Sequence, residues 1–347
     1  MESLQNVKIV FAGLGDRING SHYLRSSFVR IQKNSLKPFL KEIIPFAITN
    51  TSSVTGILRN SLELRKFLSN IQPDLVHAHY GSTTALITLL ASYRKYPFII
   101  SFCGNDLISY SSPNVIETSR VFLATLISRF CSHFADLILV KSENLFHELP
   151  SSVKPKAHIL PNGVDLNRFR PISQLESREK LRLSPDNSII VFSKTKGSET
   201  VKCPRLAYDT FSLLQKRLKN SMLLEIGNES YEKMPLYLNA ADVLILTSLC
   251  EGSPNIVKEA MACNLPVVSV DCGDVRDRLK NVSPGGVFNR DSQTLALQIE
   301  SILANKSRSN GRVELEKQRL SIDEVANNLI KILLEYLSKS PRFSRNH

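Results

Sequence analysis

The sequence predicts an α/β protein with two doubly wound parallel-sheet domains. Short apolar runs alternate with helical stretches along the first half of the chain, and the same alternation restarts in the second half. Few polar residues interrupt these runs, which is typical of parallel strands covered by helices on both faces. A segment rich in proline, asparagine and glycine, "HILPNGVDLNRFRP", separates the two halves and indicates an interdomain connection.

The first half, residues 1–165, is predicted to form one domain. Its expected strands are Val7–Ala12, Leu75–Ala78, Phe98–Phe102 and Leu137–Val140. Its expected helices lie near His22–Gln32, Gly56–Ile71, Thr83–Tyr93 and Asn114–Phe134.

Residues 166–320 are predicted to form the second domain. Its expected strands are Ile189–Phe192, Met222–Ile226, Val243–Leu246 and Val267–Val270. Its expected helices lie near Arg205–Leu218, Met234–Ala241, Pro254–Cys263 and Thr294–Ala304. Residues 321–347 hold a last helix, Ile322–Leu337, and a tail, which we expect to pack back on the first domain. Two such domains predict a ligand in the cleft between them, at the carboxyl ends of the strands.

Composition limits the class of protein. The 347 residues carry 42% hydrophobic and 22% charged side chains, which are globular values. The net charge of +12 is spread over both halves, without a lysine and arginine cluster or a nucleic-acid module, so nucleic acid is not an expected partner. No apolar run is long enough to span a membrane. The six cysteines show no C-x-x-C spacing, which fits a reducing cytoplasm and no metal or disulfide.

A glycine-rich turn follows the first expected strand. Gly13, Gly15 and Gly20 in "GLGDRING" have the spacing G-x-G-x-x-x-x-G instead of the dinucleotide pattern G-x-G-x-x-G, and no acidic residue ends the second strand. A nicotinamide-dependent dehydrogenase is therefore a weaker alternative. Gly20, placed just before the expected helix, could let the backbone approach a ligand closely. The simpler alternative is a set of turn glycines.

The segment "EGSPNIVKEAMA" predicts an anion site. Ser253 as N-cap and Pro254 in the first turn predict a helix start, which offers unpaired N–H groups and partial positive charge. Glu251 precedes that start and Glu259 lies inside the helix. An anion flanked by two carboxylates that accept hydrogen bonds from hydroxyl groups fits a nucleotide diphosphate sugar. The alternative is a solvated surface helix with an ordinary cap.

Three motifs resemble family 4 glycosyltransferases of the GT-B fold, also described as glycosyl transferases group 1. "YLNAADVLILTSLCEGSPNIVKEAMACNLPVVSVDCGDVRD" is similar to their donor-binding region, and Glu251 and Glu259 match their E-x7-E motif. "LPNGVDLNRFRP" resembles the family's linker, and "PDLVHAHYGSTTALITLLASYRKYPFIISFCGNDL" resembles its acceptor-domain core. The resemblance covers nearly the whole chain and implies an N-terminal acceptor domain and a C-terminal donor domain, both Rossmann-like.

The resemblance implies a role for each matching residue. Glu259 would bind the ribose hydroxyls, and Glu251 would orient the transferred sugar. The backbone of the turn would cradle phosphate and sugar at Ser253, Pro254, Asn255 and Ile256. Family members retain the anomeric configuration, generally by a front-face route, so no protein nucleophile is expected.

The family also places basic residues on the diphosphate. Lys202 lies where its lysine usually lies and is expected to act in catalysis with Glu251. The second cation is left open between Lys194 and Lys196, with Lys196 assigned to donor binding. The alternative for these lysines is an exposed loop side chain. A helix N-terminus and a lysine can stabilise a leaving diphosphate, so neither a metal nor a cofactor is expected.

The chain departs from the family pattern in the loop "SFCGNDL". Many relatives carry histidine where this chain has Cys103, and a neutral thiol cannot replace it. Gly104 and Asn105 are candidates for sugar contact with Cys103, and Asp106 is a candidate catalytic residue. His79 is more simply a satisfied histidine at a strand end. Asn264 stands where glycine usually follows the helix, and asparagine tolerates the left-handed conformation needed there.

The prediction is therefore a retaining hexosyltransferase that moves a sugar from a nucleotide donor to a glycan or lipid-linked glycan. Bacterial surface polysaccharide, including lipopolysaccharide, is the expected pathway. A cytoplasmic protein is expected, with peripheral contact to the inner membrane face inferred from family and charge. Two alternatives stay open, a nucleotide-sugar epimerase on the same fold and a non-catalytic sugar-nucleotide-binding protein. The sequence does not identify the base, sugar, acceptor, linkage or oligomeric state.

Overall fold

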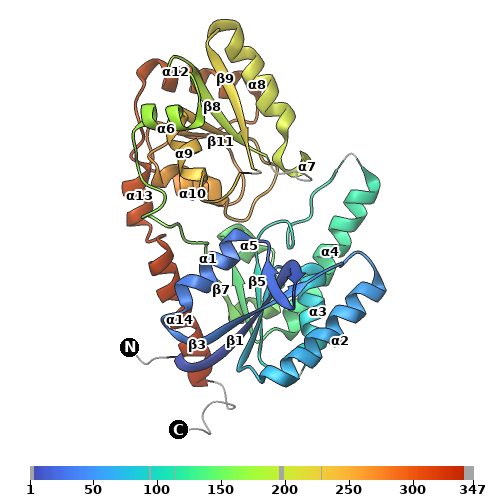
Figure 1. Ribbon diagram of the computed structural model, residues 1–347. Coiled ribbons are helices and arrows are strands. Elements are labelled where there is room, and N and C mark those ends of the chain that lie inside the picture. The colour runs from blue at the N-terminus through green and yellow to red at the C-terminus, as the bar shows by residue number, and fades with distance from the viewer. Residues whose placement is uncertain (1–3, 94, 113, 195–198, 228, 340–347) are drawn as a thin grey trace. The chain divides into compact units, whose positions relative to one another are not determined.

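The computed structural model describes residues 4–93, 95–112, 114–194, 199–227 and 229–339. The chain divides into two compact units, shown in Figure 1. Unit 1 comprises Met1–Gly163 and Ile322–His347, and unit 2 comprises Val164–Ser321. None of the helices in the described ranges is both long and apolar enough to cross a membrane.

Unit 1 is built on a mostly parallel sheet. Its strands are β1 (Leu4–Ile18), β2 (Ser21–Leu24), β3 (Leu40–Ile48), β4 (Leu75–His79), β5 (Phe98–Phe102), β6 (Leu137–Val140) and β7 (Ala157–Ile159). The parallel order is β3-β1-β4-β5-β6-β7, and β2 pairs antiparallel with the end of β1. The order therefore reverses between β1 and β4, which is the topological switch point of this sheet.

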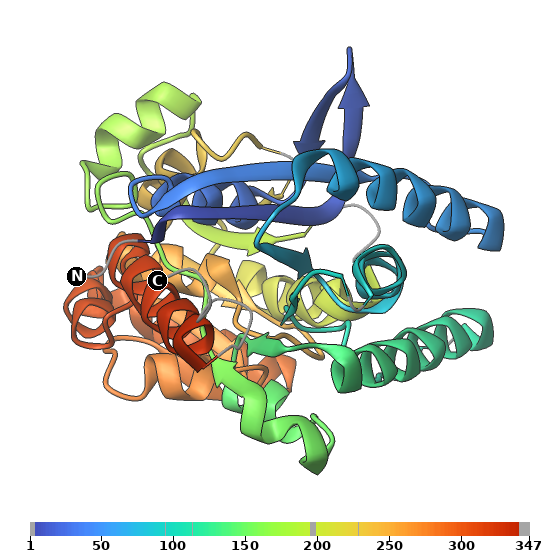
Figure 2. The same ribbon diagram turned by 90° about the horizontal axis from the view of Figure 1, so that it is seen from below.

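Helices cover both faces of this sheet (Figures 1 and 2). The elements are α1 (Ser27–Leu36), α2 (Val54–Ile71), α3 (Ser82–Ser92), α4 (Val115–Phe134), α5 (Glu143–His147), a 3₁₀ helix (Ser151–Lys156) and α14 (Ile322–Lys339). Helix α3 contacts α2 on one side and α4 on the other, and α1 contacts α14. Apolar side chains of β1, β3 and β4 pack against α2 and α3, while β5 and β6 pack against α3 and α4. The last helix thus belongs to the fold of unit 1.

Unit 2 contains a wholly parallel five-stranded sheet. Its strands are β8 (Ser188–Ser193), β9 (Ser221–Ile226), β10 (Val243–Leu246), β11 (Val267–Val270) and β12 (Gly286–Phe288). Its helices are α6 (Gln174–Leu181), α7 (Glu199–Lys202), α8 (Pro204–Arg217), α9 (Met234–Ala240), α10 (Asn255–Ala262), α11 (Val275–Leu279), α12 (Ser292–Asn305) and α13 (Gly311–Lys317). The order β9-β8-β10-β11-β12 reverses between β8 and β10, the switch point of the second sheet.

The predicted parallel strands are confirmed, but the helix predicted near His22–Gln32 is wrong at its start. Ser21–Leu24 forms β2, and the helix begins only at Ser27. Asn19 and Gly20 have φ values of 49° and 77°, which is the hairpin turn that an Asn-Gly pair favours. Gly20 therefore lies in a turn between two strands, and the prediction that it precedes a helix is wrong.

The start of α10 differs from the prediction by one residue. Pro254 is the N-cap, with φ −65° and ψ 116°, and no side chain caps the helix. The predicted N-cap, Ser253, instead accepts a hydrogen bond from the Lys258 ammonium at 3.0 Å, so its hydroxyl is used outside the cap. At the other end Asn264 has φ 54°, which confirms the left-handed residue expected after the helix.

The hairpin makes unequal demands on its two glycines. A Cβ on Gly15 would lie 2.1 Å from the Tyr23 carbonyl oxygen, whereas a Cβ on Gly20 would meet nothing within 4 Å. We expect Gly15→Ala to lower the free energy of unfolding by about 3 kcal/mol through overpacking. Gly20→Ala, which adds only left-handed strain, should lower it by about 1 kcal/mol. Urea unfolding of both variants checks the difference, and equal losses would contradict it.

Candidate functional site

The predicted donor residues of unit 2 come from elements that meet at the carboxyl edge of its sheet. The loop 247–254 follows β10, and α7 follows β8, so both lie beside the switch point. Backbone carbonyls of α7 accept hydrogen bonds from this loop: Leu249 N–H donates to the Val201 carbonyl at 2.8 Å, and the Thr247 hydroxyl donates to the Lys202 carbonyl at 2.8 Å. The position of Lys202 is therefore fixed against the loop that carries Glu251.

Lys202 and Glu251 form an ion pair. Lys202 Nζ lies 2.6 Å from Glu251 Oε1, and each side chain is 17% exposed. The Ser248 hydroxyl donates to the same carboxylate oxygen at 2.9 Å. The fold thus brings together two residues that are 49 positions apart in sequence, and both were predicted at this site. Ser248 was missed because nothing in the sequence marks it among other loop serines.

The backbone around this pair is held by a close approach and by an arginine. Gly273 has φ 58°, and a Cβ there would lie 2.7 Å from the Gly252 carbonyl oxygen and 2.9 Å from that of Glu251. Arg290 donates to the Thr247 carbonyl at 2.9 Å and to the Ser248 carbonyl. Neither residue was predicted from the sequence. Both contacts restrict the backbone of the loop that carries Glu251.

The turn residues Ser253, Pro254, Asn255 and Ile256 form the entrance to α10. Ser253 and Pro254 are buried, Ile256 is 7% exposed, and Asn255 is partly exposed. Lys258, fully buried one turn further on, donates to the Ser253 hydroxyl. Helix α10 has eight residues, and its N-terminus, with a buried ammonium beside it, is electrostatically suited to an anion.

Glu259 lies further along α10 and is partly buried. Its carboxylate has no hydrogen-bond partner among the described residues, and burial raises its pKa to about 7 although Lys258 opposes the shift. Burial raises the pKa of Tyr231, and the Glu259 charge adds to that rise, which places the phenol close to the carboxylate. A half-buried carboxylate without donors of its own is suited to accept hydrogen bonds from a ligand.

Tyr231 is part of an aromatic cluster that was not predicted from the sequence. Its ring lies 5.3 Å from that of Phe169 at an interplanar angle of 64°, and the Arg168 guanidinium lies 5.2 Å from the ring centre. Phe169 and Arg168 belong to the segment that the sequence identified as a connection. The side chains beside Glu259 are therefore aromatic and cationic.

The second predicted cation is not placed by the structure. Lys196 lies outside the described residues, which omit 195–198. Lys194 is described, and its ammonium lies 3.1 Å from the Tyr208 hydroxyl and 3.8 Å from Glu225. Lys194 is thus engaged by side chains of α8 and β9.

The loop 103–106 of unit 1 is organised around Asp106. Its buried carboxylate accepts hydrogen bonds from the backbone N–H groups of Gly81 (2.7 Å), Gly104 (2.7 Å) and Cys103 (3.0 Å). Burial raises the pKa of Asp106, and these backbone donors oppose the rise. A carboxylate used in this way holds the loop in shape, so the geometry favours a positioning role over the predicted catalytic one.

The predicted sugar-contact residues flank that carboxylate. Burial raises the pKa of the Cys103 thiol to about 12, so it is neutral. Gly104 is buried, and Asn105 is exposed and accepts a hydrogen bond from the Tyr80 hydroxyl. Tyr80 has φ 103° and Ser82 has φ 53°, which are strained values for such residues at the end of β4.

Two histidines lie at the same edge of the unit 1 sheet. His77 Nε2 is 2.7 Å from the Ser101 hydroxyl, and burial lowers its pKa to about 3. His79 is 4% exposed, its ring stacks on His77 at 4.0 Å, and neither ring nitrogen has a hydrogen-bond partner among the described residues. The expectation that His79 is a satisfied histidine is wrong. Burial lowers its pKa far below the usual value, so the ring is neutral.

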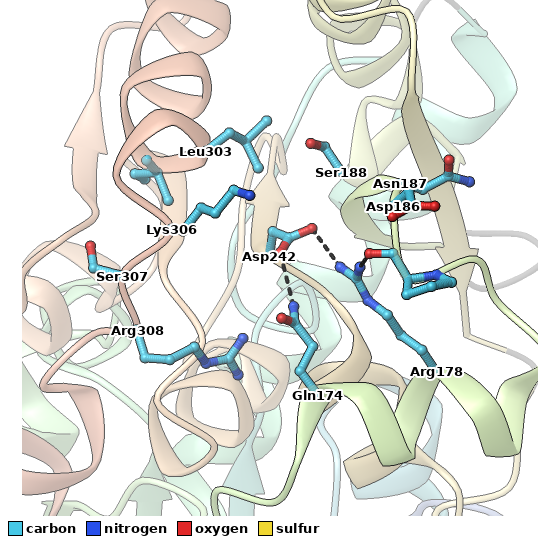
Figure 3. A pocket seen from close by; sticks show the side chains of 12 residues that line it. Gln174, Arg178, Asp186, Asn187, Ser188, Asp242, Leu303, Lys306, Ser307 and Arg308 are labelled. Atoms are coloured by element: carbon cyan, nitrogen blue, oxygen red, sulfur yellow. Dashed lines mark hydrogen bonds and ion pairs between the residues drawn. The ribbon is translucent and has the colours of Figure 1, made fainter.

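The cavity in Figure 3 lies at the opposite edge of the unit 2 sheet. Its volume is about 250 Å³. Ser188 and Asp242 line it, and because they stand at the amino ends of β8 and β10, the cavity lies at the amino edge of the sheet. Arg178 donates to Asp242 at 2.8 Å and to the Ala240 carbonyl at 2.9 Å, and Gln174 donates to Asp242 at 2.8 Å. These bonds anchor α6, and none of the predicted donor residues lines the cavity. Among the described side chains, no group of three or more His, Cys, Asp or Glu residues is arranged to hold a metal ion.

Comparison with known proteins agrees with this architecture. A family model described as Glycosyltransferase Family 4 matches residues 34–168, and one described as Glycosyl transferases group 1 matches residues 212–305. Sucrose-phosphate synthase from Thermosynechococcus elongatus has a similar structure, with a TM-score of 0.77 and 15% identity over 96% of this chain and 100% of that one. This likeness is one of fold.

Curated proteins also match this chain at the level of sequence. TuaC of Bacillus subtilis (strain 168), a glycosyltransferase named for teichuronic acid biosynthesis, is 26% identical over 222 residues, 59% of this chain and 55% of its own length. The UDP-Gal:alpha-D-GlcNAc-diphosphoundecaprenol alpha-1,3-galactosyltransferase of Escherichia coli is 26% identical over 263 residues, 65% of this chain and 64% of its own length. The matches thus span less than two thirds of either relative.

Two parallel-sheet α/β units with these neighbours define the GT-B fold, as predicted. The chain belongs to glycosyltransferase family 4, of the group 1 type. This confirms the resemblance stated from the motifs around Glu251 and Glu259.

The raised pKa of Glu259 predicts a pH-dependent stability. The folded protein holds this proton up to about pH 7, whereas the unfolded chain releases it near its ordinary value of 4.5. The contribution of Glu259 to stability therefore falls as pH rises between these values. Glu259→Gln, which is neutral throughout, should stabilise the protein little at pH 5 and by up to about 3 kcal/mol at pH 8. Urea unfolding of variant and parent at both pH values checks this, and an equal difference at both would contradict it.

Proposed function

We propose that this protein is a retaining glycosyltransferase that moves a sugar from a nucleoside diphosphate sugar to a glycan or lipid-linked glycan. The single observation that carries the proposal is Glu259, a partly buried carboxylate without a hydrogen-bond partner among the described residues. Ribose hydroxyl groups would supply the donors that the fold does not. The Bacillus subtilis and Escherichia coli relatives are both named as glycosyltransferases, which supports the same activity here.

The rest of the site can be assigned along such a donor. Glu259 lies four residues after the start of α10, about 6 Å along the helix axis at about 1.5 Å per residue. A ribose at Glu259 would thus place the diphosphate near the first turn of the helix and the sugar near Glu251. The diphosphate would also meet Lys202, whose ammonium is 2.6 Å from Glu251.

The chemistry follows from where charge develops. Breaking the bond between the sugar and the diphosphate builds negative charge on the β-phosphate. The N-terminus of α10 and the Lys202 ammonium would stabilise that charge, and their positions are fixed before the reaction begins. Glu251, held by Lys202 and Ser248, would orient a sugar hydroxyl. We propose retention by a front-face route in which no protein side chain attacks the sugar.

Unit 1 would supply the acceptor side. Loop 103–106 is held rigidly by Asp106 and follows β5 at the carboxyl edge of the sheet, so Gly104 and Asn105 are candidate sugar contacts there. The Escherichia coli relative is named for an acceptor linked to diphosphoundecaprenol, which supports a lipid-linked acceptor. The Bacillus subtilis relative is named for teichuronic acid, which supports a role in polysaccharide biosynthesis. We propose that the protein works at the cytoplasmic face of the membrane.

The first test is ligand stabilisation by a panel of nucleotides. UDP, GDP, ADP, CMP and NAD at matched concentrations should include one nucleoside diphosphate that raises Tm without magnesium. Because a ligand stabilises by RT ln(1 + [L]/Kd), 100 times Kd should add about 2.7 kcal/mol. The variant Glu259→Gln should need at least a tenfold higher nucleotide concentration for the same rise in Tm. A shift with NAD alone, or none with any nucleotide, would contradict the proposal.

Lys202→Ala tests the leaving-group role. With the sugar donor whose base the panel selects, turnover should fall by about 10²–10³-fold, the range for loss of one preorganised transition-state contact. Lys216→Ala removes an exposed lysine of α8 in the same unit and is the matched control. Turnover of Lys202→Ala equal to that of the control would show that another cation stabilises the diphosphate.

A further inference from the structure

Lys141 is a buried lysine that the reaction proposed above does not use. It directly follows β6 at the carboxyl edge of the unit 1 sheet, and only 1% of the residue is exposed. Among the described residues, no group accepts a hydrogen bond from its ammonium or forms an ion pair with it. Burying a charge without a partner costs free energy, so a lysine at this position needs an explanation.

The alternation of side chains places Lys141 on a polar face of the sheet. Phe102 and Val140, which pair in register on β5 and β6, both belong to the apolar core against α3 and α4. Because side chains alternate between the two faces of a strand, the next residues, Cys103 and Lys141, lie on the opposite face. Burial lowers the pKa of His79, at the end of β4, and the Lys141 charge lowers it further, so this ring lies near the ammonium.

His79 is a second buried side chain on this face whose polar atoms are unsatisfied. Neither of its ring nitrogens has a hydrogen-bond partner among the described residues. The neutral ring carries one N–H donor and one bare nitrogen. His77 does not satisfy either, because its own Nε2 contacts the Ser101 hydroxyl at 2.7 Å. The ends of β4 and β6, on either side of β5, thus present an imidazole and an ammonium that the described part of the chain leaves without partners.

Asp106 is the carboxylate whose charge acts on Lys141, but it is committed elsewhere. Burial lowers the pKa of Lys141, and Cys103 and Asp106 oppose that shift. The oxygens of Asp106 accept hydrogen bonds from three backbone N–H groups, and the two side chains form no ion pair. The Lys141 ammonium therefore lacks a paired counter-ion among the described residues.

We propose that Lys141 binds an anionic group of the acceptor sugar, either a carboxylate or a phosphate. Lys141 lies beside Cys103, which begins the loop that carries the candidate sugar contacts Gly104 and Asn105. A sugar held by this loop brings its substituents close to the end of β6. The four-carbon stem of a lysine lets the ammonium reach the edge of the sheet while the stem stays buried. The acceptor role rests on the proposed function, whereas the anion site in unit 1 does not.

A charged ligand explains these donors better than a neutral one. The ammonium only donates hydrogen bonds, and the neutral His79 ring adds one N–H donor. A water molecule or a sugar hydroxyl accepts a hydrogen bond but leaves the lysine charge uncompensated. A carboxylate or a phosphate supplies several acceptor atoms together with the missing negative charge. The same two side chains therefore select a sugar that carries an anionic substituent.

Replacing Lys141 by methionine tests the lack of a partner without any ligand. Lys141→Met keeps an unbranched side chain and removes the buried ammonium, so the variant should unfold at a higher urea concentration than the parent. Lys66→Met, at an exposed lysine of α2 in the same unit, is the matched control and should leave the midpoint unchanged. A midpoint for Lys141→Met no higher than that of the parent would show that the fold itself satisfies the ammonium and would overturn the proposal.

Isothermal titration calorimetry of the full chain then identifies the anion. The probes are the methyl glycosides of glucose and galactose, the corresponding methyl uronosides, and the 6-phosphates of both sugars. The uronosides or the sugar phosphates should bind at least about tenfold more tightly than the neutral glycosides, because hydrogen bonds to charged groups are the stronger ones. The set that binds distinguishes a carboxylate from a phosphate.

The variants and simple anions complete the test. Lys141→Met should bind charged and neutral sugars equally, and Lys66→Met should keep the parent's preference. Charged sugars that bind the parent no better than neutral ones, or a preference that survives in Lys141→Met, would overturn the proposal. So would acetate or inorganic phosphate that binds as tightly as the charged sugars. Nucleotide stabilisation is measured without sugar and this titration without nucleotide, so failure of one proposal is distinguishable from failure of the other.

Discussion

The parallel pairing of buried strands is the constraint on which both units depend. Each parallel connection must return the chain to the same end of the sheet, so the loops that leave the carboxyl ends of the strands gather along one edge. In unit 2 this brings α7 and the loop after β10 together, and Lys202 meets Glu251 although 49 residues separate them. In unit 1 the same rule brings the end of β4 beside loop 103–106, where Tyr80 contacts Asn105. Reversal of the strand order then leaves space at the edge that loops and ligands can use.

Much of this arrangement could be predicted from the sequence, since uninterrupted apolar runs such as Val243–Leu246 have few other interpretations. Strand β3 was missed because Pro45 and charged residues interrupt its pattern. The structure explains the exception: among the described strands β3 pairs only with β1, and an edge strand tolerates a proline that a central strand does not. The E-x7-E pair was recognisable from spacing, but Ser248, Tyr231 and Gly273 act through contacts that depend on the folded chain. The use of the Asp106 carboxylate by three backbone donors likewise depends on the folded chain.

Several unfavourable local features lie at the carboxyl edges of the sheets. Glu259 is held where burial disfavours its charge, and the two buried nitrogens of His79 lack partners among the described residues. Tyr80 and Ser82 adopt left-handed backbone angles that side chains rarely take. Each of these lowers stability, and the apolar layers against α2, α3 and α4 outweigh them. Such unfavourable features at the predicted binding edges are what a fold selected for function should show.

The Lys202–Glu251 ion pair has a consequence for ligand choice. Because the two charges satisfy each other, a ligand must compensate both when it separates them. A phosphate alone would leave the carboxylate without its cation, and a neutral sugar alone would leave the ammonium without its anion, each at the expense of an unpaired, largely buried charge. Only a molecule that carries an anion and hydroxyl donors at adjacent positions satisfies both. If the proposed donor binds here, the closed pair would thus disfavour free phosphate and free sugar.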